Sequence, residues 1–419
     1  MLRHLLPTTV VGSYSVPEWL ERLKTEYYQR RISAAHLAEI HEVAIKAAIK
    51  DQEQAGIDIV SDGELRRDND IDYFLARIPG VLIERRAKAD YYDYYDAEVA
   101  AQLPEDEKAS LGLADDYSFT ARLTGRPVKF SFTGPFSLSR RISAAGYPDP
   151  ADLVRALARR LNLEARSLAA AGAGFLQIDE PFLAGYPDQA ALAVEAVNIV
   201  TDGVPVTWAL HVCYGNRYAR PSWEGHYDFL FPAVLQARVD QLVLEFARKG
   251  LGDLHLIKDY RWPFQLGFGV IDVKSPTVEA PELVAERIRR ALEYIEPERL
   301  MINPDCGLRH LEPEVARRKL HAMVTGAAIV RAELGLVQPG LVEPGLVEPG
   351  LVEPGGHQQN FPSSAPAHLP SSSTPAHLPS SSTPAHLPSS STPAYLPSPA
   401  PGDSDSRFSG SQPTGDSNG

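Results

Sequence analysis

The chain is poor in sulfur: its 419 residues contain two cysteines, Cys213 and Cys306, and three methionines. Two thiols in a chain of this length are too few for a disulfide framework. No stretch reaches the 18 or so apolar residues that span a bilayer, and the apolar run in the amino-terminal MLRHLLPTTVVGS is too short for a signal peptide. These absences predict a cytoplasmic protein without a membrane segment.

Positive charge is also scarce. Lys and Arg number 41 against 54 Asp and Glu, and the formal net charge is −13. Phosphate backbones are bound by clustered Lys and Arg, and no basic stripe is present, so nucleic acid is not expected as a partner. The adjacent Arg66 and Arg67 leave room for a small anion.

The composition divides the chain in two. Residues 1–333 alternate apolar runs with amphipathic segments, whereas residues 334–419 consist largely of Pro, Ser and Gly in GLVxP and SSSTPAHLP-like repeats. Such a tail cannot bury enough apolar surface to offset its chain entropy. We therefore predict one folded domain over 1–333 and a disordered low-complexity tail over 334–419.

The folded part shows eight short β-rich runs, each ending in Gly, Pro or a polar cluster. They span residues 8–14, 56–64, 128–135, 174–181, 206–215, 240–247, 264–272 and 300–308. Helical spacing of apolar residues is found between them, over 34–55, 151–172, 227–239, 281–295 and 312–332. Strands that alternate with helices indicate a parallel sheet. Eight such units predict an α/β fold of the TIM (β/α)8 barrel type.

The segment 80–127 interrupts this alternation and is predicted to be an inserted excursion after the second strand. It is rich in tyrosine, for example in ADYYDYYDAEVA. We interpret these tyrosines as a packed satellite, with a lid over the active site as the alternative.

Polar residues follow nearly every β-rich run, where the loops of a TIM barrel build the active site. His211 and Cys213 are two residues apart on a strand and point to the same face. Cys306 ends the last run and Glu245 ends the sixth. Two sulfurs, one imidazole and one carboxylate suit a tetrahedral zinc ion, although a single buried Cys or His is more often a core residue.

Such a centre favours thiol chemistry over hydrolysis. Thiolate ligands weaken the Lewis acidity that zinc needs to activate water, whereas a thiol that binds zinc loses its proton outright. Free thiols titrate near 8.5 and are mostly protonated at neutral pH. The sequence therefore predicts a zinc enzyme that alkylates a small thiol.

An ordered set of motifs resembles the catalytic barrel of cobalamin-independent methionine synthase over about residues 8–330. The motifs are VVGSY, DIVSDGELRRD, TGP, QIDEP, HVCYGN, GVIDVKSP and NPDCGL. The resemblance implies zinc bound by His211, Cys213, Glu245 and Cys306, and methyl transfer to homocysteine to give methionine. It also implies that Ser13 holds the carboxylate of homocysteine, and that Glu64 and Asp179, the catalytic carboxylates, hold its amino group. For these two acids an ordinary strand-end salt bridge is the structural alternative.

The resemblance departs from the family on the side that would bind folate. Its start near residue 8 leaves no room for the amino-terminal barrel with which the full-length synthase holds polyglutamyl folate. The family Trp after TGP is replaced by Phe136-Ser137-Leu138, and Lys274 replaces a family His. We therefore predict a methyl-corrinoid donor, free or on a partner protein, in place of methyltetrahydrofolate.

Several alternatives remain open at this point. Within the superfamily, they are a methyltetrahydropteroylglutamate donor, and alkylation of another thiol such as coenzyme M, whose sulfonate would need Arg66 or Arg67. Outside it, a zinc hydrolase would want more His and carboxylate ligands, and a non-catalytic zinc- or thiol-binding protein would keep the metal alone. The oligomeric state and the role of the tail have no signal in the sequence.

Overall fold

The computed structural model describes residues 5–84, 90–104 and 110–335. Six parallel strands form its main sheet, in the order β3-β5-β6-β7-β8-β9. Their bounds are Phe130–Thr133, Phe175–Asp179, Thr207–Val212, Gln241–Leu244, Gln265–Ile271 and Leu300–Pro304. Each strand falls within one of the predicted β-rich runs, and each is buried along most or all of its length.

Two short extended segments close this sheet into a barrel. Thr8 pairs with Ile302 on β9, Thr9 pairs with Ile59, and Val60 pairs with Val128 just before β3, all in parallel. The hydrogen bonds Thr9 N to Ile302 O (2.9 Å) and Lys129 N to Val60 O (2.9 Å) join the two edges of the sheet. The runs predicted at 8–14 and 56–64 therefore take the first two strand positions of a TIM barrel. Each is paired with its neighbours through isolated bridges and does not form a regular strand.

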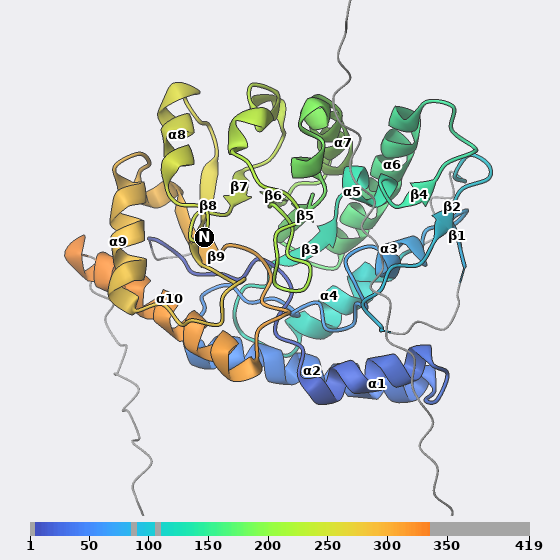
Figure 1. The fold of residues 1–419 in the computed structure, drawn as a ribbon, viewed down its shortest axis with the longest axis horizontal. Helices are drawn as coiled ribbons and strands as arrows, with labels where there is room; N and C mark the ends of the chain where they lie inside the picture. The colour runs from blue at the N-terminus through green and yellow to red at the C-terminus, as the bar shows by residue number, and fades with distance from the viewer. Residues whose placement is uncertain (1–4, 85–89, 105–109, 336–419) are drawn as a thin grey trace, which may run out of the picture. The chain divides into compact units, whose positions relative to one another are not determined.

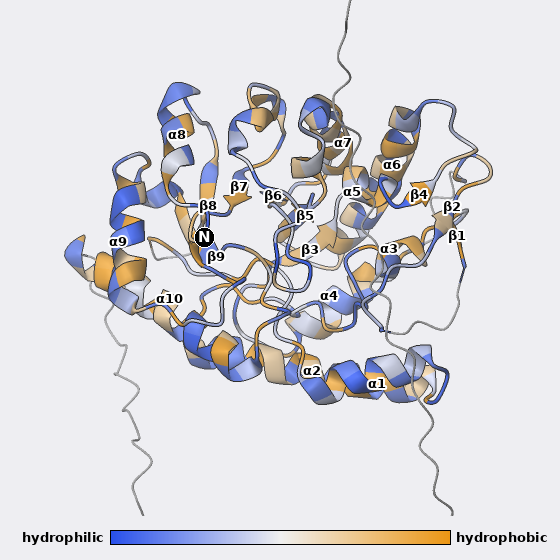
Figure 2. Cartoon of the chain, in the orientation of Figure 1, coloured by the Kyte–Doolittle hydropathy of each residue, from blue (hydrophilic) through white to orange (hydrophobic). Residues whose placement is uncertain are grey.

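Helices cover the outside of the strands (Figure 1). The long ones are α1 Glu18–Tyr28, α2 Ala34–Ala55, α6 Pro150–Ala170, α7 Ala190–Thr201, α9 Pro281–Leu292 and α10 Pro313–Glu333. Helix α2 begins where the Ser33 side chain accepts a hydrogen bond from His36 N (3.2 Å) and ends at Gly56, whose φ of 90° few other residues adopt. Hydrophilic and hydrophobic residues alternate along α1, α2, α9 and α10 (Figure 2), as expected of helices with one face on the barrel.

The predicted excursion after the second strand position is confirmed, because this segment forms structure outside the barrel sheet. It contains β1 Leu82–Ile83, β2 Ala97–Glu98 and α4 Leu113–Ala121, and α3 Asp72–Leu75 precedes it. Strand β2 pairs with both β1 and β4 Ile142–Ser143 in a small second sheet. Its Tyr91 and Tyr92 are buried.

One predicted helix is wrong. The segment 227–239 forms two short 3₁₀ turns, Tyr227–Leu230 and Ala233–Gln236, instead of one α-helix. The cause is Pro232, which cannot donate a backbone hydrogen bond and disfavours helical geometry in the residue before it. Phe231 accordingly has an extended backbone, with φ −97° and ψ 144°. The short helices α5 Pro135–Ser139 and α8 His255–Asp259 were not anticipated.

The predicted disordered tail falls almost entirely outside the described residues, which end at 335. Helix α10 ends at Glu333, and the division of the chain at 333 stays a prediction. Among the described helices, none combines the length and the apolar character needed to cross a membrane.

Candidate metal and thiol site

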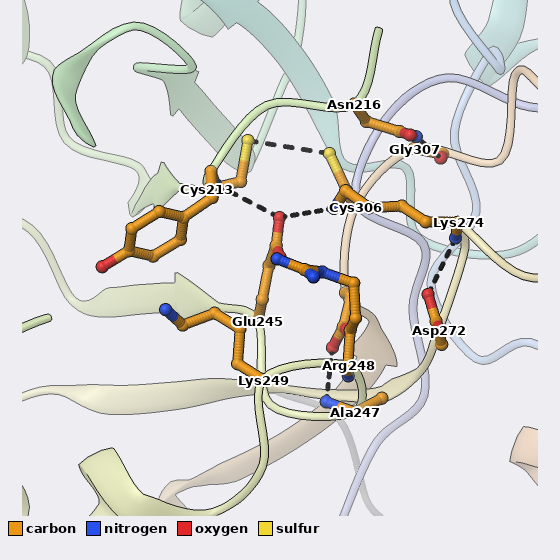
Figure 3. Close-up of polar contacts among 12 residues, drawn as sticks. Cys213, Asn216, Glu245, Ala247, Arg248, Lys249, Asp272, Lys274, Cys306 and Gly307 are labelled. Carbon is orange, nitrogen blue, oxygen red and sulfur yellow. Dashed lines mark hydrogen bonds and ion pairs between the residues drawn. The ribbon is translucent and has the colours of Figure 1, made fainter. Parts of the chain in front are cut away.

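Three potential metal ligands meet at the carboxyl ends of the strands. His211 lies on β6, Cys213 follows that strand, and Cys306 follows β9. One ligand atom from each lies within 4.8 Å of the others, and all three residues are buried. Figure 3 shows the sulfurs of Cys213 and Cys306 facing each other, at a distance of 3.7 Å.

These donors fit a zinc ion. Two thiolates bound tetrahedrally at about 2.3 Å from zinc stand about 3.8 Å apart, close to the separation of the two sulfurs here. His211 Nε2 is buried and has no hydrogen-bond partner. A buried ring nitrogen without a partner is costly, and a metal ligated at that atom would remove the cost.

Asp179 orients the histidine. Its Oδ1 lies 2.8 Å from His211 Nδ1, which leaves Nε2 for the ligand position. A carboxylate behind a ligating imidazole is the usual outer-shell arrangement in zinc sites. Burial would lower the pKa of His211, but the hydrogen bond with Asp179 and the nearby Cys306 sulfur outweigh burial and raise it to about 10.

The two thiols behave as a coupled pair. Their mutual hydrogen bond, aided by His211 and Lys274, holds the pKa of Cys306 well below its usual range despite burial. The same hydrogen bond, together with burial, raises the pKa of Cys213. Metal binding to such a pair requires both sulfurs as thiolates, so it would displace the proton that the Cys213 thiol keeps.

Glu245 lies beside this cluster but is not one of the three converging groups. It follows β7, and its Oε1 accepts hydrogen bonds from Lys274 Nζ (2.9 Å) and from Tyr214 N (3.3 Å). Its Oε2 is buried without a partner. Burial raises the pKa of Glu245 to about 7, against the opposing charge of Lys274.

The second group of predicted residues contains the carboxylates Glu64 and Asp179. Glu64 Oε1 accepts hydrogen bonds from Ser131 Oγ (2.7 Å) and pairs with Arg67 (3.0 Å). The backbone of Glu64 has a φ of 56°, a left-handed conformation that is uncommon for residues other than glycine. Burial raises the pKa of Glu64, with Asp179 adding to the effect and Arg67 opposing it.

Glycines let the chain approach these groups. A Cβ on Gly12 would lie 2.3 Å from Glu64 Oε1, and a Cβ on Gly307 would lie 2.0 Å from Ser13 Oγ. Both separations are too short for any larger residue. Gly12 and Gly307 therefore leave the space that the side chains of Glu64 and Ser13 occupy.

One cavity of about 270 Å³ joins the two groups. Its lining includes every predicted site residue except Glu245, namely Ser13, Glu64, Asp179, His211, Cys213 and Cys306. Larger cavities of about 730 and 940 Å³ exist elsewhere, but neither is lined by a cysteine. The smaller cavity has the size of an amino acid with some room beside it.

Several residues that line this cavity were not predicted from the sequence. Aromatic side chains line it from three segments, with Tyr92 and Tyr94 from the excursion, Phe182 after β5 and Trp223 after β6. The excursion tyrosines thus do more than pack as a satellite. Nothing in their local sequence distinguishes them from other surface-loop aromatics.

Polar residues deeper in the barrel were also missed. Lys129 Nζ donates to Gln177 Oε1 (2.7 Å), and Gln177 Nε2 donates to Asp179 Oδ1 (2.7 Å). Gln177 and Asp179 alternate with apolar residues on β5 and so share a face. That alternation of polar residues along a buried strand was the signal available in the sequence.

Other strand-end acids have structural contacts. Glu180 accepts from the backbone N–H groups of Phe136 and Ser137 at the start of α5. Asp305 accepts from three successive N–H groups after Glu245, at 2.8–2.9 Å. These acids fix the loops that carry the site.

Comparison with known proteins identifies the family of the chain. The chain matches the family described as cobalamin-independent synthase, catalytic domain, over residues 6–329. Residues 332–355 match a GLTT repeat in six copies. The description of the family does not support the predicted methyl-corrinoid donor, and it favours the pteroylglutamate alternative.

Individual relatives cover nearly the same span. The chain is 38% identical to the methionine synthase of Thermococcus kodakarensis over 331 residues, or 79% of this chain and 95% of that protein. It is 35% identical to the methionine synthase of Saccharolobus solfataricus over 332 residues, covering 79% and 96%. The structure of a B12-independent methionine synthase from a Shewanella species, in complex with selenomethionine, matches with a TM-score of 0.69 and 27% identity, covering 80% of this chain and 100% of that one. The chain therefore belongs to the cobalamin-independent methionine synthase family, as a methyltransferase enzyme built on a TIM barrel.

Proposed function

We propose that this enzyme transfers a methyl group to the sulfur of homocysteine, giving methionine, with zinc held by His211, Cys213, Cys306 and Glu245. The observation that carries the proposal is the single cavity lined by both the sulfur–imidazole cluster and the two carboxylates. The related Shewanella structure contains selenomethionine, the selenium analogue of the proposed product, which supports an amino acid as the ligand.

The carboxylate end of the cavity suits the ammonium group of the substrate. Glu64 and Asp179 present two negative charges to one cation, and charge-assisted hydrogen bonds of this kind select an amino-acid thiol over a plain one. Ser13 lines the same cavity and would donate its hydroxyl to the substrate carboxylate. A substrate anchored at these three residues would direct its sulfur towards the two cysteines.

The metal end prepares that sulfur for attack. Bound zinc would remove the thiol proton and hold the sulfur as a nucleophile at neutral pH. Asp179 holds the ring of His211 through Nδ1, so one carboxylate serves both the substrate and the ligand set. In the transfer, a sulfur–carbon bond forms, the bond from methyl to the donor breaks, and the departing donor atom takes up the electron pair.

For the donor we propose a methyltetrahydropteroylglutamate, in which the methyl–nitrogen bond breaks and the nitrogen takes a proton. Two observations support it: the family is described as cobalamin-independent, and Phe182 and Trp223 line the cavity with aromatic rings. The ring centroids of these two residues lie 5.6 Å apart in an edge-on arrangement. Exposed aromatic faces of this kind bind flat conjugated rings.

A methyl-corrinoid donor is the second candidate, and one observation favours it. Phe136, at the position where the family carries its folate-stacking Trp, is fully buried and lines no part of the cavity. The thiol alternative is less favoured. Arg66 pairs with Asp116 and Arg67 with Glu64, and neither lines the cavity, so the two arginines expected to bind the sulfonate of coenzyme M do not reach it. Arg217 and Arg309 do line the cavity, and the two facing acids are the reason to prefer an amino-acid thiol.

The test is a side-by-side assay. Zinc-loaded protein with L-homocysteine is given methyltetrahydropteroylglutamate or methylcobalamin, and methionine is quantified. Methionine formed from the pteroylglutamate supports the proposal. Methionine formed only from methylcobalamin would show that the donor is a methyl-corrinoid. Turnover of mercaptoethanesulfonate with no turnover of homocysteine would overturn the choice of thiol.

A further inference from the structure

Lys274 is a buried cation that contacts the metal site but lies outside the converging ligand group. Its Nζ lies 2.9 Å from Glu245 Oε1, and the side chains of the two residues are 4% and 0% exposed. A buried ion pair returns little net stability, because removing both charges from water costs about as much as their attraction gains. The pair therefore calls for an explanation beyond stability.

Both partners are fixed by their own loops. Asp272 Oδ1 accepts from Lys274 N (2.8 Å), and Asp272 N donates to Glu279 Oε1 (2.8 Å), which sets the turn after β8. On the other side, Asp305 holds the backbone that follows Glu245. Figure 3 shows Lys274 and Glu245 reaching the cysteine pair from these two loops. Lys274 therefore approaches Glu245 from a rigid support.

The two carboxylate oxygens of Glu245 have different surroundings. Oε1 is occupied by Lys274 and Tyr214 N, whereas Oε2 is buried without a partner. Neither oxygen lies within 4.8 Å of all the other three ligand atoms. Glu245 therefore stays outside the three converging groups, and its Oε1 is held by the ammonium group of Lys274.

Charge gives this arrangement a purpose. Two thiolates and a carboxylate already carry more negative charge than zinc neutralises, and an incoming thiolate would add to it. The Lys274 ammonium offsets part of that excess at a site where the low dielectric makes each charge count. A lysine here both weakens the hold of Glu245 on the metal and favours the arrival of an anionic sulfur.

We propose that Lys274 is a positioning residue that restrains Glu245, so that His211, Cys213 and Cys306 hold the metal firmly and Glu245 yields to the substrate thiol. This inference rests on the proposed function, because it takes the substrate sulfur to approach the metal. It also gives a role to Lys274, a departure from the family pattern.

The test is a double-mutant cycle on metal affinity, measured by competition with a chromogenic chelator. Lys274→Met frees Glu245 to bind the metal fully, so zinc affinity is expected to rise about tenfold, within the range typical of outer-shell changes. Adding Glu245→Gln removes the carboxylate, so this gain is expected to disappear in the double variant. In cobalt-loaded protein, sulfur-to-cobalt absorption is expected to require about tenfold more homocysteine in Lys274→Met than in the wild type.

Arg331→Met is the matched control. Arg331 also pairs with an acid, Asp58, at 2.7 Å with exposures of 7% and 19%, and its other hydrogen bonds go to the carbonyl oxygens of Leu5 and Leu6. It should leave zinc affinity unchanged. Thermal unfolding of each metal-free variant, and Lys274→Arg as a cation-retaining variant with wild-type affinity, separate a loss of fold from the proposed role.

Two results would overturn the inference. Zinc affinity in Lys274→Met that is unchanged or weaker would show that Lys274 does not restrain Glu245. A gain that persists in the double variant would show that Lys274 acts through its charge alone. If instead the wild type and Cys306→Ser bind zinc equally weakly, the metal site of the proposed function is wrong, and the inference is lost with it.

Discussion

The two ends of the cavity are built from similar residues but differ in how far the chain satisfies them. At the carboxylate end, Glu64 is held by Ser131 and Arg67, and Asp179 by Gln177 and His211. At the metal end, His211 Nε2 and Glu245 Oε2 are buried with no hydrogen-bond partner. The first end is ordered by the protein itself, and the second is completed only by something the protein binds.

This difference indicates where an external ion belongs. Buried polar atoms in folded proteins are nearly always paired, and His211 Nε2 is an unpaired one that belongs to a residue grouped with two thiols, which is the setting of a ligand position. Asp179 is the link between the ends, because its Oδ1 contacts both Gln177 and His211. The ends can therefore be separated by mutation on either side of Asp179, but not at Asp179 itself.

The largest effect is expected from removing a ligand at the metal end. Cys306→Ser should lower zinc affinity by at least about 100-fold, beyond the 10- to 100-fold typical of outer-shell changes, and should abolish methionine formation. Zinc content after dialysis and chelator competition measure it. The metal-free variant should unfold at nearly the wild-type temperature. A full zinc complement in this variant would contradict the assignment.

Asp179→Asn is expected to damage both ends at once. The neutral amide loses the charge that faces the substrate ammonium and no longer fixes the His211 tautomer. Zinc affinity should fall about 10- to 100-fold, and the KM for homocysteine should rise. Asp240→Asn, which alters an acid outside the cavity lining that accepts from Trp208 N, is the control. An unchanged zinc affinity would show that the two ends are independent.

Glu64→Gln should separate the ends. Loss of one charge-assisted hydrogen bond, worth about 1.5–3 kcal/mol, is expected to raise the KM for homocysteine about 10- to 100-fold while zinc affinity stays at the wild-type value. Calorimetric titration with homocysteine and with a thiol that lacks an amino group measures the contrast. If both thiols lose affinity equally, Glu64 does not recognise the ammonium.

A smaller effect is expected at the aromatic lining. Trp223→Ala should raise the KM for the pteroylglutamate donor about tenfold, since stacking of a flat base on an aromatic side chain contributes about 1–3 kcal/mol. Trp223→Phe should retain most of the affinity. Trp19→Ala removes a 45% exposed Trp on α1 and serves as the control. A change in homocysteine KM instead would assign Trp223 to the thiol half of the site.

The last prediction concerns stability instead of binding, at the buried cation Lys129, which contacts Gln177. Burial lowers the pKa of Lys129 to about 7, against the opposing charges of Asp179 and Glu64. Between pH 7 and the usual lysine pKa near 10.4, the unfolded chain therefore binds more protons than the folded one, and this side chain makes stability rise with pH. As the pH rises through that window, the free energy of unfolding of the wild type should increase relative to that of Lys129→Met by up to about 1.4 kcal/mol per pH unit. Urea unfolding of both proteins at pH 7 and pH 9 measures this difference. If the wild type instead gains stability over the variant as the pH falls, the prediction is wrong.

Much of the fold could be predicted because its signals are local. The eight β-rich runs occupy the eight strand positions of the barrel, and the predicted bounds of α2 match the structure. Helices α1 and α7 were not predicted. The prediction failed over 227–239, where apolar residues recur at helical spacing but Pro232 prevents an α-helix. Spacing reports which residues are apolar, whereas the backbone constraint of a single proline decides whether they share a helix.

The candidate site divides in the same way. The sequence by itself determined that His211 and Cys213 share a face, and that Cys306, Glu245, Glu64 and Asp179 follow strands, because strand periodicity and strand ends are short-range properties. Only the tertiary structure decided that Glu245 is paired with Lys274 across 29 residues, and that Tyr92 and Trp223 line the same cavity. Such contacts depend on how distant loops fold over the barrel, and no local pattern records which partner a buried charge will find.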